Sequence, residues 1–270
     1  MTERAMMTAT AVECAAGLLA DARLARTRFA SLPADCRPPD EAAAYAVQDA
    51  LHRRLGAAGL GALAGHKIGC TTAVMQRFLN IANPCAGGVF ASTVQHGHGT
   101  FRHADFLHVG VECEIAVRLA KPLPASGAPY DRDGIAAAVD ACMAAIEVVD
   151  DRYEDYRSLD TPTLIADDFF NAALVLADPV ESWSELDLAR VSGRMTINGG
   201  EVGTGSGGDI LGHPLEALAW LANALAARGR SLAAGEFVLL GSVVQTRWVE
   251  AGDLVEVEIE GLGRASCRFS

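Results

Sequence analysis

The segment Val-Glu-Cys-Glu-Ile-Ala-Val at residues 111–117 places the strongest constraint on how this chain can fold. Side chains two apart in a strand point to the same face, so Glu112 and Glu114 would project together while the apolar residues line the other face. Two neighbouring carboxylates repel each other unless a positive group lies near them. A strand with one solvated face shows the same alternation, so the pair alone leaves both interpretations open.

A third acidic residue, Glu147, lies in the run Ala-Ala-Ile-Glu-Val-Val-Asp, among residues that favour burial. Three carboxylates directed toward an apolar interior call for a hard divalent cation, Mg²⁺ or Mn²⁺, which takes oxygen ligands and keeps positions for water and substrate. We therefore expect Glu112, Glu114 and Glu147 to form a metal site.

The composition is that of a globular protein that does not bind nucleic acid. Half of the 270 residues are hydrophobic, which is enough for one large core. The net charge of −12 disfavours a nucleic-acid partner, whose phosphates need a basic surface. The seven scattered cysteines, without a Cys-x-x-Cys pair, are typical of reduced thiols in a cytoplasmic protein. The sequence predicts neither a signal peptide nor a membrane span.

The chain divides into a helical region and a larger domain rich in strands. Two alanine-rich stretches with charges at helical spacing occupy 9–28 and 40–58, and Asp40 is a typical N-cap for the second. We expect residues 1–60 to form a helical region that serves packing or a subunit contact. Residues 61–270 would form the catalytic domain.

Short segments punctuated by glycine follow, and the second half of the chain is mostly β. The patterns predict a short helix over 73–80, an alanine-rich helix over 133–145 that leads into a buried strand at 145–150, a hairpin turn at Asn198-Gly199, a helix over 215–227, and strands at 238–240, 248–249 and 255–259 divided by Gly241 and Gly252.

Lys67 lies between apolar and small residues in the segment Gly-His-Lys-Ile-Gly-Cys-Thr-Thr at 65–72. An ammonium there is partly desolvated unless it faces a carboxylate or an anionic ligand. An isolated lysine is more often a surface residue, but beside a carboxylate metal site Lys67 becomes a candidate for gripping an acid substrate or moving a proton. Thr71 and Thr72 would cap a helix or donate hydroxyls to a ligand.

Polar residues in two further segments are candidates for the same cavity. Arg152 directly follows two aspartates and would orient a neighbouring acid, or form a plain surface ion pair. Asp167, Asp168 and Asn171 lie in strongly apolar sequence, and buried polar groups need partners. This second segment therefore lines the cavity, or forms a turn with ordinary capping acids.

Seven sequence pieces occur in a characteristic order: GHKIGCTT at 65–72, VECEIAV at 111–117, AIEVVDDR at 145–152, IADDFFN at 165–171, NGGEVGTGSGGDILGHP at 198–214, LAWLAN at 218–223 and AGDLVEVEIEGLG at 251–263. Together they resemble the fumarylacetoacetate hydrolase superfamily, and within it the branch of 2-keto-4-pentenoate hydratases and 4-oxalocrotonate decarboxylases. The resemblance covers nearly the whole chain.

This resemblance implies an α+β fold, a mixed β-roll with an N-terminal helical region, and a homo-oligomer. It also implies a Mg²⁺ or Mn²⁺ ion and substrates that are 2-oxo or 2-hydroxy-dienoic acids from ring-cleavage pathways. The family's metal-binding acids correspond to Glu112, Glu114 and Glu147, and its active-site lysine corresponds to Lys67. The candidates for substrate binding on this basis are Thr71, Thr72, Asp168 and Arg152.

The expected function is that of a metal-dependent hydratase, which adds water to a conjugated double bond to give a 4-hydroxy-2-oxo acid. In a 4-oxalocrotonate-type decarboxylase the same enolate arises by loss of CO₂, and a C–C hydrolase of a related oxo acid is a further alternative. A different class would be a non-catalytic partner subunit that keeps the acids for a structural metal.

The chain departs from the family pattern at three places that bear on the substrate. Many hydratases of this branch carry aspartates in the segment that matches 81–87, around Ala82 to Cys85, and this chain has none there. His66 stands where an aromatic residue is frequent, and Asp168 stands where an asparagine is frequent.

Overall fold

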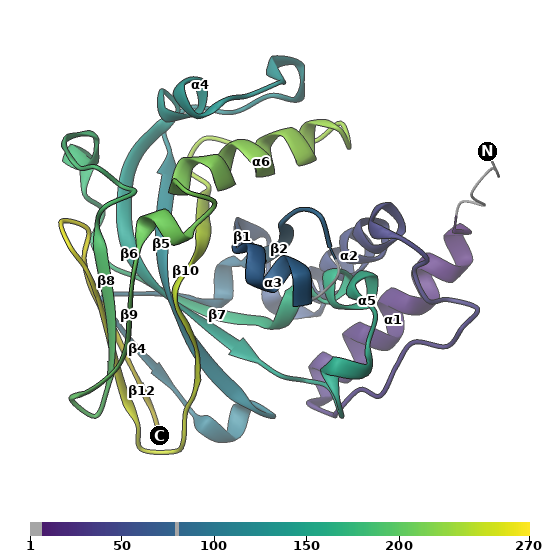
Figure 1. Ribbon diagram of the computed structural model, residues 1–270. Helices are drawn as coiled ribbons and strands as arrows, with labels where there is room; N and C mark the ends of the chain where they lie inside the picture. Colours follow the sequence, from purple (N-terminus) through teal and green to yellow (C-terminus); the bar gives the residue numbers. More distant parts are fainter. Residues whose placement is uncertain (1–6, 79–80) are drawn as a thin grey trace.

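The computed structural model describes residues 7–78 and 81–270, which form two mixed β-sheets flanked by helices (Figure 1). The larger sheet has seven strands in the order β2-β1-β10-β5-β6-β7-β3. Their bounds are β1 Leu63–Gly69, β2 Cys85–Phe90, β3 Val94–His96, β5 Val109–Leu119, β6 Val139–Asp150, β7 Asn171–Leu176 and β10 Phe237–Trp248.

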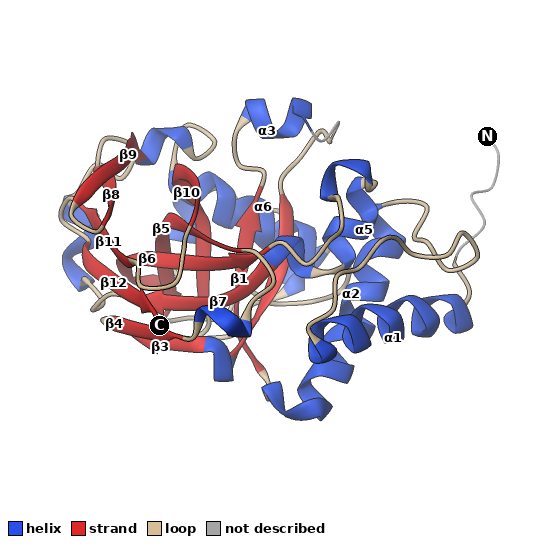
Figure 2. Cartoon of the chain, turned by 90° about the horizontal axis from the view of Figure 1, so that it is seen from below, coloured by secondary structure: helices blue, strands red, loops and turns tan. Residues whose placement is uncertain are grey.

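The smaller sheet has five strands in the order β4-β12-β11-β8-β9. Its members are β4 His98–Phe101, β8 Ser192–Ile197, β9 Gly200–Ser206, β11 Leu254–Ile259 and β12 Gly263–Phe269. Seen from below, the strands curl into a roll, with most helices gathered at one side (Figure 2). The prediction of an α+β fold with a mixed β-roll is confirmed.

Two helices precede the roll, α1 over Ala9–Ala25 and α2 over Glu41–Leu55, followed by a π-helical turn over Gly56–Leu60. Asp40 is the N-cap of α2, as predicted, because its carboxylate accepts a hydrogen bond of 2.9 Å from the amide of Ala43. The helices lie beside the roll, together with α5 (Figure 1). Residues 1–6 of the predicted helical region lie outside the described residues.

The remaining helices are short except for the last: α3 Ala73–Phe78, α4 Arg132–Ala136, α5 Thr161–Ala166 and α6 Pro214–Ala226. Helix α6 and the hairpin turn at Asn198 and Gly199, whose φ angles are 53° and 80°, confirm the predictions for these segments. The predicted helix over 73–80 corresponds to α3, and its last two residues lie outside the described residues. None of the described helices is both long and apolar enough to cross a membrane.

The predicted helix over 133–145 is wrong, because only α4 is helical and β6 begins at Val139. Strand β6 pairs with β5 from Val139 to Asp150, and nearly all of its side chains are buried. Alanine has the highest helix propensity, but a strand that is covered on both faces gains ladder hydrogen bonds and burial that outweigh that preference. The small alanines fit between the packed layers.

Gly241 does not divide two strands as predicted, because β10 runs through it. The pairing register of β10 against β5 shifts between Leu239 and Ser242, which marks a bulge at Gly241. Gly241 has a φ of 139°, a conformation that only glycine adopts readily. The bulge therefore redirects the strand without ending it, and Trp248 is its last residue.

Strand β1 presents neighbouring residues to opposite faces of the sheet. His66 is buried, with Nε2 4.0 Å from Oε2 of Glu236. Burial, followed by the positive groups of His52, Arg230 and Arg228, lowers the pKa of His66 to about 3. The imidazole of His66 is therefore neutral in the folded protein at neutral pH, while the next side chain, Lys67, is directed to the opposite face.

We expect His66→Phe to make the protein less sensitive to acid. In the unfolded chain a histidine takes up its proton below a pKa of about 6.5, whereas folded His66 takes it up only near 3. His66 therefore costs stability as pH falls through this window, about 2 kcal/mol by pH 5. Urea unfolding at pH 7 and pH 5 should show a smaller loss in the variant. The exposed His96→Phe serves as control, and an equal loss in all three proteins would contradict the assignment.

Candidate active site

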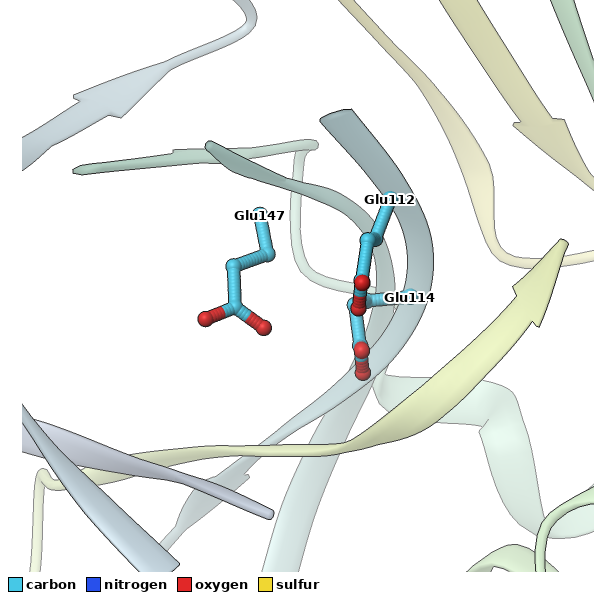
Figure 3. A group of neighbouring side chains, drawn as sticks. All are labelled: Glu112, Glu114 and Glu147. Atoms are coloured by element: carbon cyan, nitrogen blue, oxygen red, sulfur yellow. The ribbon is translucent and has the colours of Figure 1, made fainter. Parts of the chain in front are cut away.

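Three carboxylates meet on one face of the larger sheet. Glu112 of β5 lies directly opposite Glu147 of β6 in the pairing register, and Glu114 lies two residues further along β5 on the same face. One ligand oxygen from each residue can be chosen so that all lie within 4.8 Å of one another. Figure 3 shows Glu112 and Glu114 projecting side by side, with Glu147 beside them. The predicted set of metal ligands is thus brought together.

Burial makes this arrangement costly for the apoprotein. Glu114 and Glu147 are each only 1% exposed. Burial, followed by the neighbouring carboxylate of Glu147, raises the pKa of Glu112, and the same causes raise the pKa of Glu114 well above its usual range. A divalent cation has the charge and the preference for oxygen that this donor set needs. The residues therefore fit a hard metal ion.

Lys67 provides positive charge beside these acids. Its Nζ lies 3.3 Å from Oε1 of Glu147 and donates a hydrogen bond of 2.7 Å to the carbonyl oxygen of Phe169. Burial lowers the pKa of Lys67, but Glu147, Glu112 and Glu114 together raise it by more, so its pKa lies above the usual value. Lys67 is therefore an ammonium ion held at the edge of the acidic cluster.

Neutral donors fix the orientation of each carboxylate. The amide of Asn171 donates to Oε1 of Glu147 at 2.9 Å, the backbone N–H of Gly241 donates to Oε2 of Glu114 at 2.7 Å, and the hydroxyl of Thr246 donates to Glu112. A side chain at Gly241 would collide with Thr71, so the bulge in β10 requires glycine. These contacts organise the ligands before any metal binds.

The two predicted threonines differ in their surroundings. Thr71 is buried and packs against Gly241, the residue whose backbone N–H donates to Glu114. The hydroxyl of Thr72 accepts a hydrogen bond of 3.3 Å from the amide of Met75 and thus lies at the start of α3. A role for either residue in substrate binding stays a prediction.

Arg152 is buried and is engaged by the turn that follows α5. Its Nε donates to Oδ2 of Asp167 at 3.0 Å, and its other nitrogens donate to the carbonyls of Asp167, Phe170 and Asn171. Arg152 thus orients an acid, as expected, but that acid is 15 residues away and is not one of the two aspartates before it. Binding of substrate by Arg152 stays a prediction.

Asp168 is fully buried and its carboxylate is bound by the N-terminal helices. Arg23 of α1 lies 2.9 Å from Oδ2, and Nε2 of His52 of α2 lies 2.6 Å from Oδ1, which also accepts from the amide of Gly88 at 2.9 Å. Burial raises the pKa of Asp168, but His52, Arg23 and Gly88 lower it by more. No sequence pattern pointed to Arg23 or His52, because both lie in ordinary alanine-rich helices.

Comparison with known proteins identifies the family of this chain. The family description "Fumarylacetoacetate (FAA) hydrolase C-terminal" matches residues 83–270. The chain belongs to the fumarylacetoacetate hydrolase family. It is 34% identical over 261 residues to a 2-keto-4-pentenoate hydratase of Paraburkholderia phymatum. The alignment covers 96% of this chain and 97% of that relative. It is 31% identical over 226 residues to a 4-oxalocrotonate decarboxylase of Pseudomonas putida, with 84% of each chain covered.

Solved structures of the fumarylacetoacetate hydrolase family include one that resembles this chain throughout. The 4-oxalocrotonate decarboxylase from Pseudomonas putida G7, complexed with magnesium and adipate, matches with a TM-score of 0.91 and 29% identity over 99% of this chain and 100% of that one. The resemblance to this branch of the family is confirmed.

The segment 81–87, in which the sequence has no aspartate, carries other side chains beside the strand of the lysine. Asn83 donates to Oε2 of Glu41 at 3.0 Å, and the buried Cys85 pairs in register with Gly69, two residues after Lys67. The segment therefore places a cysteine, and no carboxylate, next to the strand of the lysine.

As a test of the metal site in this family member, we expect Mg²⁺ or Mn²⁺ to raise the melting temperature in a saturable way. Binding to the folded state alone adds about 2.7 kcal/mol at a hundredfold excess over Kd. Glu114→Gln and Glu147→Gln should abolish the shift, because each removes a buried ligand. The exposed Glu256→Gln on β11 should keep it. An undiminished shift in both buried variants would rule out this site.

Proposed function

We propose that the protein is a divalent-metal-dependent hydratase that adds water to a short 2-hydroxy-dienoic or 2-oxo-enoic acid in the catabolism of aromatic ring-cleavage products. The observation that carries this proposal is the meeting of Glu112, Glu114 and Glu147 with Lys67 on one face of the sheet. One relative that covers the chain almost from end to end is a 2-keto-4-pentenoate hydratase, which supports hydration. We further propose that the enzyme is a cytoplasmic homo-oligomer.

Mg²⁺ or Mn²⁺ held by the three glutamates would act as a Lewis acid toward the 2-oxygen of the substrate. Lys67 is protonated and buried, so its ammonium can pair with the carboxylate of an oxo acid and can deliver a proton at the substrate. Asn171 and Gly241 keep two of the glutamates in place during turnover. The sheet and the turn after α5 keep bulk water away from these groups.

A second candidate is a 4-oxalocrotonate-type decarboxylase. The structural relative that matches with a TM-score of 0.91 is such a decarboxylase, and its complex contains adipate, a dicarboxylate. Both reactions pass through an enolate of a 2-oxo acid, so the same acids and lysine serve either one. The two candidates differ in substrate charge and in product.

We expect 2-hydroxypenta-2,4-dienoate to be consumed with Mg²⁺ or Mn²⁺, followed as loss of dienol absorbance, and to be stable with chelator. Glu114→Gln should abolish turnover. Lys67→Met should lower kcat/KM by about 10² to 10⁴ while the metal-induced rise in melting temperature persists. Lys121→Met, which changes an exposed lysine, is the matched control. Full activity of Lys67→Met would contradict a catalytic role for Lys67, whereas metal binding without any turnover in the wild type would favour a non-catalytic partner subunit.

Product analysis separates the two reactions. With the dienoate we expect a 4-hydroxy-2-oxo acid and no CO₂, because hydration conserves every carbon atom. With 4-oxalocrotonate, metal-dependent release of CO₂ at a higher kcat/KM than dienoate hydration would favour the decarboxylase. Two acid fragments from a longer oxo acid would instead identify a C–C hydrolase.

A further inference from the structure

The turn between α5 and β7 has an unusual backbone. Asp168, Phe169 and Phe170 have φ angles of 58°, 49° and 69°, so three successive residues other than glycine are left-handed. Bulky residues rarely adopt this conformation, and it persists only where the surroundings enforce it. The turn approaches β2 closely, because a side chain at Gly87 would lie 2.9 Å from the carbonyl oxygen of Asp168.

This turn holds the lysine of the site. The carbonyl of Phe169 accepts a hydrogen bond of 2.7 Å from Nζ of Lys67. The centroid of the Phe169 ring lies 5.8 Å from the same nitrogen. The residue after the turn, Asn171, donates to Glu147 at 2.9 Å. A rotation of the turn would therefore move the partners of both Lys67 and Glu147.

Two residues from the N-terminal helices bind the turn from its other side. Arg23 of α1 reaches Oδ2 of Asp168 at 2.9 Å and the carbonyl of Asn171 at 3.3 Å, and His52 of α2 reaches Oδ1 of Asp168 at 2.6 Å. The side chain of Arg23 is 12% exposed and that of His52 is 9% exposed, so solvent has little access to these contacts. Both contacts join elements that are far apart in the sequence.

We propose that Arg23 and His52 are positioning residues that hold the left-handed turn through Asp168 and thereby fix the ammonium of Lys67 beside Glu147. The N-terminal helices then influence the reaction at the site on the sheet without contacting the substrate. The part that concerns turnover rests on the proposed function, whereas the part that concerns the placement of Lys67 does not.

The chain allows a direct test of that placement, because it contains two lysines, buried Lys67 and exposed Lys121. The intact protein is treated with acetic anhydride, and the acetylation rates of the two lysines are compared by mass spectrometry. Arg23→Met and His52→Leu should raise the acetylation rate of Lys67 relative to that of Lys121 by about tenfold or more, since a released side chain gains access to solvent, where it can lose its proton and react as the amine. His52→Gln, whose amide can still donate to Asp168, should keep the ratio low.

The control is Arg54→Met, which breaks an exposed ion pair between α2 and Glu13 of α1 but does not reach the turn. It should leave the ratio unchanged. Circular dichroism confirms that each variant is folded at the assay temperature. If a disrupting variant does not fold, the isosteric Asp168→Asn takes its place and should also raise the ratio. A ratio within about twofold of the wild type in the folded variants would overturn the proposal.

Kinetics provide the second measurement. Arg23→Met and His52→Leu should lower kcat by about tenfold to a hundredfold while KM changes little, because a displaced catalytic group costs rate more than binding. His52→Gln should restore most of kcat. Unchanged kcat in folded variants with a raised labelling ratio would refute the link to turnover. Absence of turnover in the wild type would refute only the proposed function, since the labelling result stands without it.

Discussion

An excess of buried negative charge governs this structure. Glu112, Glu114 and Glu147 share one face of the sheet, where burial and Glu147 raise the pKa of both Glu112 and Glu114, and the ammonium of Lys67 offsets only part of this rise. The register of β5 against β6 creates this excess by placing Glu112 opposite Glu147. A slip of β5 by one residue would turn both Glu112 and Glu114 to the face opposite Glu147 and break up the cluster. The bulge in β10 and the turn after α5 then supply the donors that hold each carboxylate.

The meeting of the three glutamates could be predicted, but not from their spacing alone. A second Glu-x-Glu pair, Glu256 and Glu258 on β11, has the same spacing, yet Glu256 is exposed and Glu258 pairs with Arg194 and Arg264 of the neighbouring strands. The two pairs differ in their neighbouring strands, because β6 adds Glu147 to the first pair, whereas the strands beside β11 carry arginines. The sequence predicted the pair that meets Glu147 because apolar residues surround Glu147 as well, and because the order of several motifs resembled one family.

Local patterns failed where distant parts of the chain decide the outcome. The alanines of β6 predicted a helix, but the strands on both sides of β6 impose a ladder. Gly241 looked like a strand boundary, although its amide is a ligand donor within a continuous strand. The partners of Asp168 could not be foreseen, since Arg23 and His52 lie 145 and 116 residues away from it. Helices, caps and hairpins that depend on neighbouring residues were predicted correctly.

The contact between Asp168 and the N-terminal helices also limits how such a protein can diverge. Replacing Asp168 by asparagine would remove the nearer of the two carboxylates that pair with the Arg23 guanidinium in a site that water hardly reaches, and would leave only Asp167 at 3.4 Å. Changes at residues 23, 52 and 168 are therefore coupled. A chimera that joins the helices of one relative to the sheet of another would inherit only part of this set, and its lysine would lose its place even though all three glutamates were retained.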